Sequence, residues 1–130
     1  MAERKIILSI EDDPDIAHLI QLVLRNAPAE VLTAGRADEA IALIEHRRLD
    51  LILLDLMLPQ MNGLDLLESL QQEGRIVGVP VIIVSVRTDT AQRHRAQELG
   101  VEHYVLKPFS PAKLREEIEG ALGVDWREYW

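Results

Sequence analysis

The feature that most constrains the fold of this chain is a fivefold alternation of short apolar runs with helical patterns. Apolar residues spaced three and four apart mark one face of a helix, whereas short continuous runs of Val, Ile and Leu are typical of buried strands. Strand and helix repeated with short connections predict a parallel sheet covered by helices on both faces. The expected strands are 5–10, 31–34, 51–54, 81–84 and 104–106, and the expected helices are 16–24, 37–44, 64–70, 88–99 and 111–122.

The character of each run indicates its place in the sheet. The runs at 51–54 and 81–84 are wholly aliphatic, as expected for central strands that are covered on both faces. The run at 31–34 is short and contains Thr33, so we place it at an edge. With right-handed crossovers, these placements favour the flavodoxin-like order 2-1-3-4-5. We therefore expect an α/β fold, a single doubly wound (βα)5 domain with a parallel five-stranded sheet.

Composition sets the limits of the chain's chemistry. The 130 residues suffice for one domain, and the absence of cysteine excludes disulfides, thiolate metal sites and a cysteine nucleophile. This usage fits a reducing cytosol, so we expect a cytoplasmic protein. No apolar run is long enough to span a membrane, and a net charge of −8 argues against direct binding to a nucleic-acid backbone.

Polar residues follow four of the five expected strands. Glu11 and Asp12 follow the first, Asp55 the third, Ser85 the fourth and Lys107 the fifth. The carboxyl ends of parallel strands share one edge, where ligands bind at the point at which strand order reverses. Because burying an unsatisfied polar group is costly, a carboxylate directly after four aliphatic residues, as at 55, needs partners nearby. We expect these side chains to meet in one cleft.

The electrostatics of such a cleft indicate a metal. Carboxylates at Glu11, Asp12 and Asp55 would repel one another, and a divalent cation would resolve the conflict. Oxygen ligands without His or Cys favour Mg²⁺, with Mn²⁺ as an alternative. Lys107 and Ser85 would add a positive charge and a hydroxyl donor, which suit the oxygens of a phosphoryl group in transfer to a carboxylate.

Four motifs, in this order and spacing, resemble the receiver domain of two-component response regulators: IEDDP at 10–14, LDLMLP at 54–59 with NG at 62–63, IVS at 83–85 and YVLKPF at 104–109. The resemblance extends over about residues 5–122 and implies that 1–122 form a receiver domain, with 123–130 a tail or the start of a linker. It implies Asp55 as the phosphoacceptor, Asp12 as a direct Mg²⁺ ligand, Glu11 as a ligand through water, and the backbone carbonyl of Met57 as a further ligand. It also implies that Lys107 pairs with the carboxylate and the phosphoryl oxygens, and that the peptide bond to Pro108 is cis.

A conformational switch and its partners are further implications of the resemblance. Ser85 would move toward the phosphoryl group and Tyr104 would turn inward. The 88–99 helix has few apolar residues, which agrees with a helix that shifts easily. The surface of 88–99, 104–106 and 111–122 would then contact a downstream protein, a C-terminal output domain or a second copy in a homodimer.

Phosphorelay signalling is thus the expected function. A histidine kinase or phosphotransfer protein would supply the phosphoryl group, and the domain would catalyse only its own phosphorylation and dephosphorylation. Val86 departs from the family pattern, because it stands where the family commonly has a small residue. Met57 and Arg87 occupy positions that tune the lifetime of the phosphoryl group.

Other functions fit the sequence less well. A phosphohydrolase of the haloacid-dehalogenase type needs an acid two residues after its nucleophile, where this chain has Met57. A flavodoxin needs a phosphate loop after the first strand, where Glu11 and Asp12 would repel phosphate. A receiver-like module that binds protein without phosphate would not need the complete polar set. The spacing of Trp126, Tyr129 and Trp130 allows a short helix that docks on a partner, but we favour the start of a linker.

Overall fold

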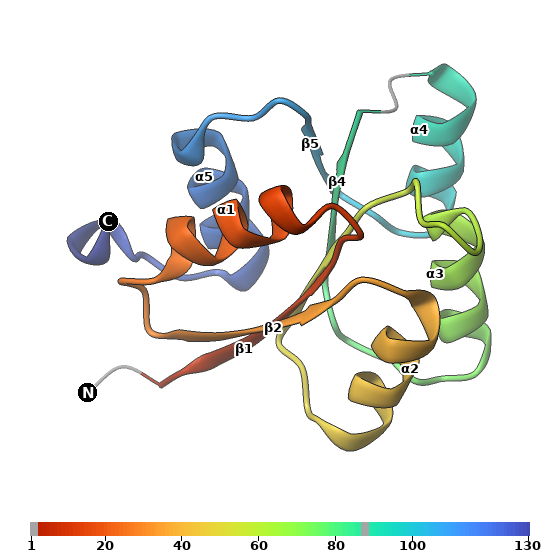
Figure 1. The fold of residues 1–130 in the computed structure, drawn as a ribbon, viewed down its shortest axis with the longest axis horizontal. Helices are drawn as coiled ribbons and strands as arrows, with labels where there is room; N and C mark the ends of the chain where they lie inside the picture. The colour runs from red at the N-terminus through yellow and green to blue at the C-terminus, as the bar shows by residue number, and fades with distance from the viewer. Residues whose placement is uncertain (1–2, 87–88) are drawn as a thin grey trace.

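The computed structural model describes residues 3–86 and 89–130, and in this part of the chain five parallel strands form one sheet in the order β2-β1-β3-β4-β5 (Figure 1). This is the order expected from the sequence, with the Thr33 strand at an edge. The strands are β1 (Lys5–Ile10), β2 (Ala29–Ala34), β3 (Leu51–Leu54), β4 (Val81–Ser85) and β5 (His103–Leu106). The helices are α1 (Pro14–Leu24), α2 (Ala37–His46), α3 (Gly63–Gln72), α4 (Thr90–Glu98) and α5 (Pro111–Leu122).

Most element ends lie within two residues of the sequence prediction, and two of the differences have a clear physical reason. Strand β2 begins two residues earlier, because Ala29 and Glu30 pair in register with Lys5 and Ile6 of β1. Neither residue carries an apolar strand signal, so the backbone pairing alone extends the strand. Helix α4 begins at Thr90, where the side chain of Asp89 accepts a hydrogen bond from the backbone N–H of Gln92. The first expected helical residue, Thr88, lies outside the described residues.

Helix starts follow the local chemistry of capping. Asp13 and Ser110 each accept a hydrogen bond from a backbone N–H of the following first turn, and a proline stands next in both sequences. Asn62 does the same for α3. Short polar side chains satisfy donors that the helix itself leaves unpaired, and proline at the first position has no donor to lose. These caps fix where each helix leaves the carboxyl edge of the sheet.

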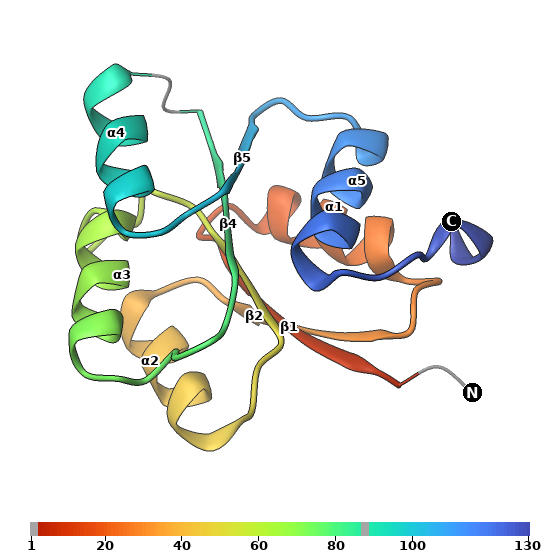
Figure 2. The same cartoon turned by 180° about the vertical axis from the view of Figure 1, so that it is seen from behind.

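The helices cover the two faces of the sheet unequally, with α1 and α5 on one side and α2, α3 and α4 on the other (Figures 1 and 2). Alternate residues of each strand enter opposite clusters: Leu8 and Ile10 lie with α2 and α3, whereas Ile7 lies with α1 and α5. Helix α3 buries four leucines, but α4 buries only Ala96. The poor apolar face expected for the 88–99 helix is therefore present in the structure.

The segment after α5 folds back on the domain instead of leading away from it. Gly123 ends α5 in the left-handed conformation, at a φ of 68° that favours glycine. Trp126 is only 4 % exposed and packs in the cluster formed with α1 and α5. A single 3₁₀ turn, η1 (Arg127–Tyr129), follows where the aromatic spacing allowed an α-helix. The carboxylate of Glu119 accepts hydrogen bonds from the Trp126 backbone N–H and from Trp130 Nε1.

Within the described residues, none of the helices has the length and apolar character needed to cross a membrane.

Candidate functional site

Three acidic side chains converge at the carboxyl edge of the sheet. Glu11 and Asp12 follow β1, Asp55 follows β3, and these two strands are neighbours. One carboxylate oxygen from each of the three lies within 4.8 Å of the others. Glu11 and Asp55 are buried, whereas Asp12 is exposed. The structure thus brings together the three carboxylates singled out in the sequence, as a set of hard oxygen donors that suits Mg²⁺ or Mn²⁺.

Lys107, the residue directly after β5, completes this cluster. Its Nζ lies 2.5 Å from Glu11 Oε1 and 3.3 Å from Asp55 Oδ2. The backbone N–H of Lys107 donates to the carbonyl of Ser85 at 3.0 Å, which ties the end of β5 to the end of β4. The following bond to Pro108 is cis, as the resemblance implied. One ammonium against three carboxylates leaves two negative charges, which is the charge that one divalent cation would neutralise.

Burial and pairing set the protonation of the cluster. Loss of solvent raises the pKa of the Glu11 carboxyl to about 7, even though hydrogen bonds from Lys107 and from the Asp13 N–H act to lower it. Burial also acts to lower the pKa of Lys107, but its hydrogen bond to Glu11 and the charge of Asp55 outweigh this effect and raise that pKa. Lys107 therefore stays charged, while Glu11 takes up a proton near neutral pH when no metal is bound.

Backbone N–H donors orient the two buried carboxylates, and nothing in the sequence predicted these hydrogen bonds. The N–H of Met57 donates to Asp55 Oδ1, and the N–H of Asp13 donates to Glu11 Oε2, both at 3.1 Å. Met57 also forms an isolated antiparallel bridge with Asn62, which holds the loop after β3. Because one oxygen of each carboxylate faces a backbone donor and the other faces Lys107, the cluster is held on two sides. The metal-binding role expected for the Met57 carbonyl stays a prediction.

Gly63 is a site residue whose importance the sequence did not reveal. A Cβ at this position would lie 2.5 Å from the carbonyl oxygen of Asp55 and 2.9 Å from the Cα of Leu56. Both atoms belong to the backbone, so they cannot turn aside as a flexible side chain would. The asparagine before it caps α3, and Gly63 lets the helix approach the chain that carries Asp55. A glycine at the first residue of a helix is the signal that could have pointed there.

The two residues expected to switch lie at different depths. Ser85 is fully buried and pairs with Leu106 in the register of β4 and β5. Tyr104 is half-buried against the α2–α4 side of the core, and the guanidinium of Arg93 from α4 lies 4.5 Å from its ring centroid. A contact thus joins α4 to β5 at this tyrosine. The switching roles of Ser85 and Tyr104 stay predictions.

The surroundings of the cluster are open on one side. A hollow of about 440 Å³ is lined by Asp12 and by the loop at 56–62. Val86 and Met57, two of the positions noted for variation from the family, are apolar and are 54 % and 51 % exposed. Arg87, the other position expected to tune the phosphoryl lifetime, lies outside the described residues. An incoming group would therefore meet Asp12 and Met57 at the surface before it reached Asp55.

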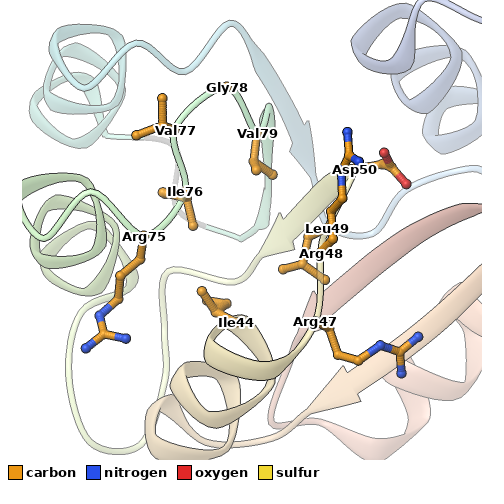
Figure 3. A pocket seen from close by; sticks show the side chains of 10 residues that line it. All are labelled: Ile44, Arg47, Arg48, Leu49, Asp50, Arg75, Ile76, Val77, Gly78 and Val79. Atoms are coloured by element: carbon orange, nitrogen blue, oxygen red, sulfur yellow. The ribbon is translucent and has the colours of Figure 1, made fainter.

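The opposite edge of the sheet has a hollow of a different kind, shown in Figure 3. Its volume is about 330 Å³, and Ile44 and Ile76 face each other across it. Arg47 and Arg75 point away from one another at its rim and pair with Glu30 and Glu45, each at 2.8 Å or less. Two of the three arginines of this hollow, Arg47 and Arg75, are therefore already paired with carboxylates, around an apolar floor.

Comparison with known proteins agrees with this geometry. Residues 7–119 match the family described as "Response regulator receiver domain". The DNA-binding response regulator MtrA of Mycolicibacterium smegmatis is 36% identical over 92% of this chain and 51% of its own length. The phosphate regulon transcriptional regulatory protein PhoB of Pseudomonas aeruginosa is 34% identical over 91% of this chain and 52% of its own. The chain thus spans about half the length of these relatives.

Solved structures show the same fold. The CheY-like response regulator receiver domain protein from Methanospirillum hungatei JF-1 superposes with a TM-score of 0.86 at 30% identity, covering 93% of this chain and 95% of that one. The signal receiver domain of a LuxO repressor protein from Vibrio parahaemolyticus gives the same TM-score at 27% identity, over 92% and 91% of the two chains. The likeness extends over nearly all of both chains.

Proposed function

The chain belongs to the family of response regulator receiver domains, the phosphorelay modules of two-component signalling, and from this premise we propose that Asp55 accepts the phosphoryl group. The observation that carries the proposal is the placement of Asp55. Its Oδ1 accepts from the Met57 N–H, its Oδ2 lies 3.3 Å from Lys107 Nζ, and two further carboxylates complete a metal-sized oxygen set. A buried carboxylate, a counter-charge and two further carboxylates thus lie together, which supports this role.

The transfer itself follows from this arrangement. A carboxylate oxygen of Asp55 forms a bond to phosphorus as the bond from phosphorus to the donor nitrogen of phosphohistidine breaks. The electron pair leaves with the imidazole, which takes its proton from water. Lys107 neutralises the oxygen charge that Asp55 shares with the phosphoryl group, and the Ser85 hydroxyl donates to a phosphoryl oxygen.

Glu11, Asp12 and the carbonyl of Met57 would hold the cation together with Asp55. Mg²⁺, or Mn²⁺ in its place, supplies positive charge for the phosphoryl oxygens when bound. The donors fit a hard cation because all are oxygens and two are buried. Attack of water on the same phosphorus would return free Asp55, so the domain would catalyse its own dephosphorylation as well as its phosphorylation.

The partners follow from the same proposal. A histidine kinase or phosphotransfer protein would be the donor, and the surface of α4, β5 and α5 would carry the signal through Ser85 and Tyr104. Helix α4 buries one residue and is tied to β5 through Arg93 and Tyr104, so a change at the tyrosine would reach it. Amide chemical shifts recorded with and without phosphoryl donor would change along α4 and β5 if this is right. Shifts confined to the acidic edge would contradict the switch.

Intact-mass measurement after incubation with acetyl phosphate and Mg²⁺ tests the acceptor. We expect one phosphoryl adduct on the native chain and none on Asp55→Asn or in a chelated sample. Asp15→Asn is the matched control, because Asp15 is an exposed acid in the first turn of α1 and should leave the adduct intact. An adduct of equal yield on Asp55→Asn would overturn the assignment.

A further inference from the structure

A basic pocket lies at the opposite end of α1 from the acidic cluster. The C-terminal segment lies beside the ends of α1 and α5 in both views (Figures 1 and 2), and a hollow of about 330 Å³ lies between these elements. Its lining includes Leu22, Arg25 and Asn26 at the end of α1, Arg115 of α5, and Tyr129 and Trp130 of the tail. The pocket exists only because residues 123–130 fold back on the domain.

The two arginines of this pocket differ from Arg47 and Arg75, which are paired with carboxylates at the hollow of Figure 3. Among residues 3–86 and 89–130, no carboxylate lies within ion-pairing distance of Arg25 or Arg115, although the chain carries a net charge of −8. The Nε of Arg115 is moreover buried and, within that same part of the chain, has no hydrogen-bond partner. A buried donor on a charged group without an acceptor is unfavourable, and native proteins seldom leave one so. Both guanidinium groups line the hollow without an acceptor from the described residues, so their charge is available to an anion that enters it.

Contacts within the tail hold the arginine in a suitable orientation. The guanidinium of Arg115 lies 5.1 Å from the ring centroid of Trp130, and that indole donates from Nε1 to Glu119 Oε1 at 3.0 Å. The ring of Trp126 packs edge-on against it at 6.0 Å. The planar guanidinium presents its N–H donors as a fork that matches the two oxygens of a carboxylate or phosphate. The contact with Trp130, whose indole is itself held by Glu119, therefore keeps Arg115 beside the hollow.

We propose that this pocket binds a small aromatic acid, with the acid group on Arg25 and Arg115 and the ring against Leu22, Tyr129 and Trp130. The volume limits the ligand to about one ring with its acid group, since ligand pockets start near 300 Å³. The hollow of Figure 3 has a similar volume, but two of its arginines already form ion pairs with Glu30 and Glu45. Carboxylate and phosphate share the chemistry that these donors recognise, and separate probes distinguish them.

Titration of the ¹⁵N-labelled protein with phenyl phosphate and with benzoate, in metal-free buffer with chelator, tests the proposal. We expect a saturable shift of the Trp130 indole N–H with at least one of these two probes. Benzyl alcohol lacks the charge, and inorganic phosphate lacks the ring. Each should bind at least about tenfold more weakly, because the loss of one charged hydrogen bond, or of the buried ring, lowers affinity by about this factor. The chelator removes any contribution from the acidic cluster, so the result is independent of the function proposed for Asp55.

Variants locate the binding. Arg25→Ala and Arg115→Lys should each weaken binding about tenfold, and Arg48→Ala, which removes an arginine of the other hollow, should leave it unchanged. Arg25 is exposed and has no described contact with the tail, so its replacement tests the site even if Arg115→Lys releases the tail. Absence of saturation with both aromatic acids, equal affinity for inorganic phosphate or benzyl alcohol, or an equal loss in Arg48→Ala would each overturn the proposal.

Discussion

At the carboxyl edge of the sheet Lys107 lies between two buried carboxylates, whereas at the amino edge Arg47 and Arg75 hold half-exposed pairs with Glu30 and Glu45. The same kinds of charge meet at similar distances in both places. The two places differ in solvent exposure, because water screens the pairs at the amino edge and is excluded from the cluster at the carboxyl edge. A buried group of charges depends on every member, while an exposed pair does not.

Removal of the buried ammonium should have the largest effect. Lys107→Met would leave Glu11 and Asp55 buried together without a counter-charge, and we expect a loss of about 3–5 kcal/mol in the free energy of unfolding of the metal-free protein. Urea denaturation in chelator measures it. Saturating Mg²⁺ should recover part of the loss, since a cation would again face the carboxylates. A loss below about 1 kcal/mol, the range of exposed pairs, would remove the distinction between the two edges.

The pH dependence of stability should be the next largest effect. The folded-state pKa of Glu11 is about 7, above the value of 4.5 for the exposed side chain, so the folded state keeps a proton that the unfolded state has lost. The free energy of unfolding of the metal-free protein should therefore fall as pH rises from about 4.5 to 7, by up to about 3 kcal/mol, and level off above. Thermal denaturation across this range measures it, and Glu11→Gln should flatten the profile. A profile that rises through this window in the native chain and is unchanged in Glu11→Gln would contradict the assignment.

Asp12, an exposed acid at the same edge, allows the effect of burial on stability to be separated from the effect of metal binding. Asp12 is exposed, so Asp12→Ala should change the stability of the metal-free protein by less than about 0.5 kcal/mol. The stabilisation by Mg²⁺, about 2.7 kcal/mol at a concentration one hundredfold above the dissociation constant, should largely disappear. Thermal denaturation with and without Mg²⁺ measures both quantities. Full Mg²⁺ stabilisation of Asp12→Ala would exclude this residue as a ligand.

The smallest effect should come from the amino edge. Arg47→Met removes a pair in which both side chains are about a third or more exposed, so we expect a change below about 1 kcal/mol that vanishes in high salt. It is the matched counterpart of Lys107→Met, because each replaces a cation by the same apolar residue. Urea denaturation at low and high salt measures the difference. Equal losses in the two variants would show that burial does not decide the strength of these clusters.

The sequence predicted the fold closely because each signal was local and each agreed with its neighbours. Aliphatic runs marked β3 and β4, and apolar residues spaced three and four apart marked the helices, as the structure confirms. Where the signal was weak the prediction fell short. Ala29 and Glu30 belong to β2 through backbone pairing with β1, which leaves no trace in their side chains.

The tail shows the same limit more sharply. Trp126 and Trp130 stood out as aromatic residues at helical spacing, but spacing does not tell which surface they contact. The structure places them on α1 and α5, where Glu119 accepts from both, and Glu119 belongs to none of the four motifs. The basic pocket beside them could not have been expected, because it takes Arg25 and Arg115 from different helices.

The sequence by itself determined the alternating pattern, the order of the strands and the set of polar residues that follow them, since these rest on periodicity and on the shared edge of a parallel sheet. Tertiary structure alone decided which oxygen faces which donor: Lys107 between Glu11 and Asp55, the Met57 N–H on Asp55, and Gly63 against its backbone. The reason is physical. Periodicity places a residue at an edge, but burial and hydrogen-bond geometry depend on every neighbour at once, and only the folded chain brings those neighbours together.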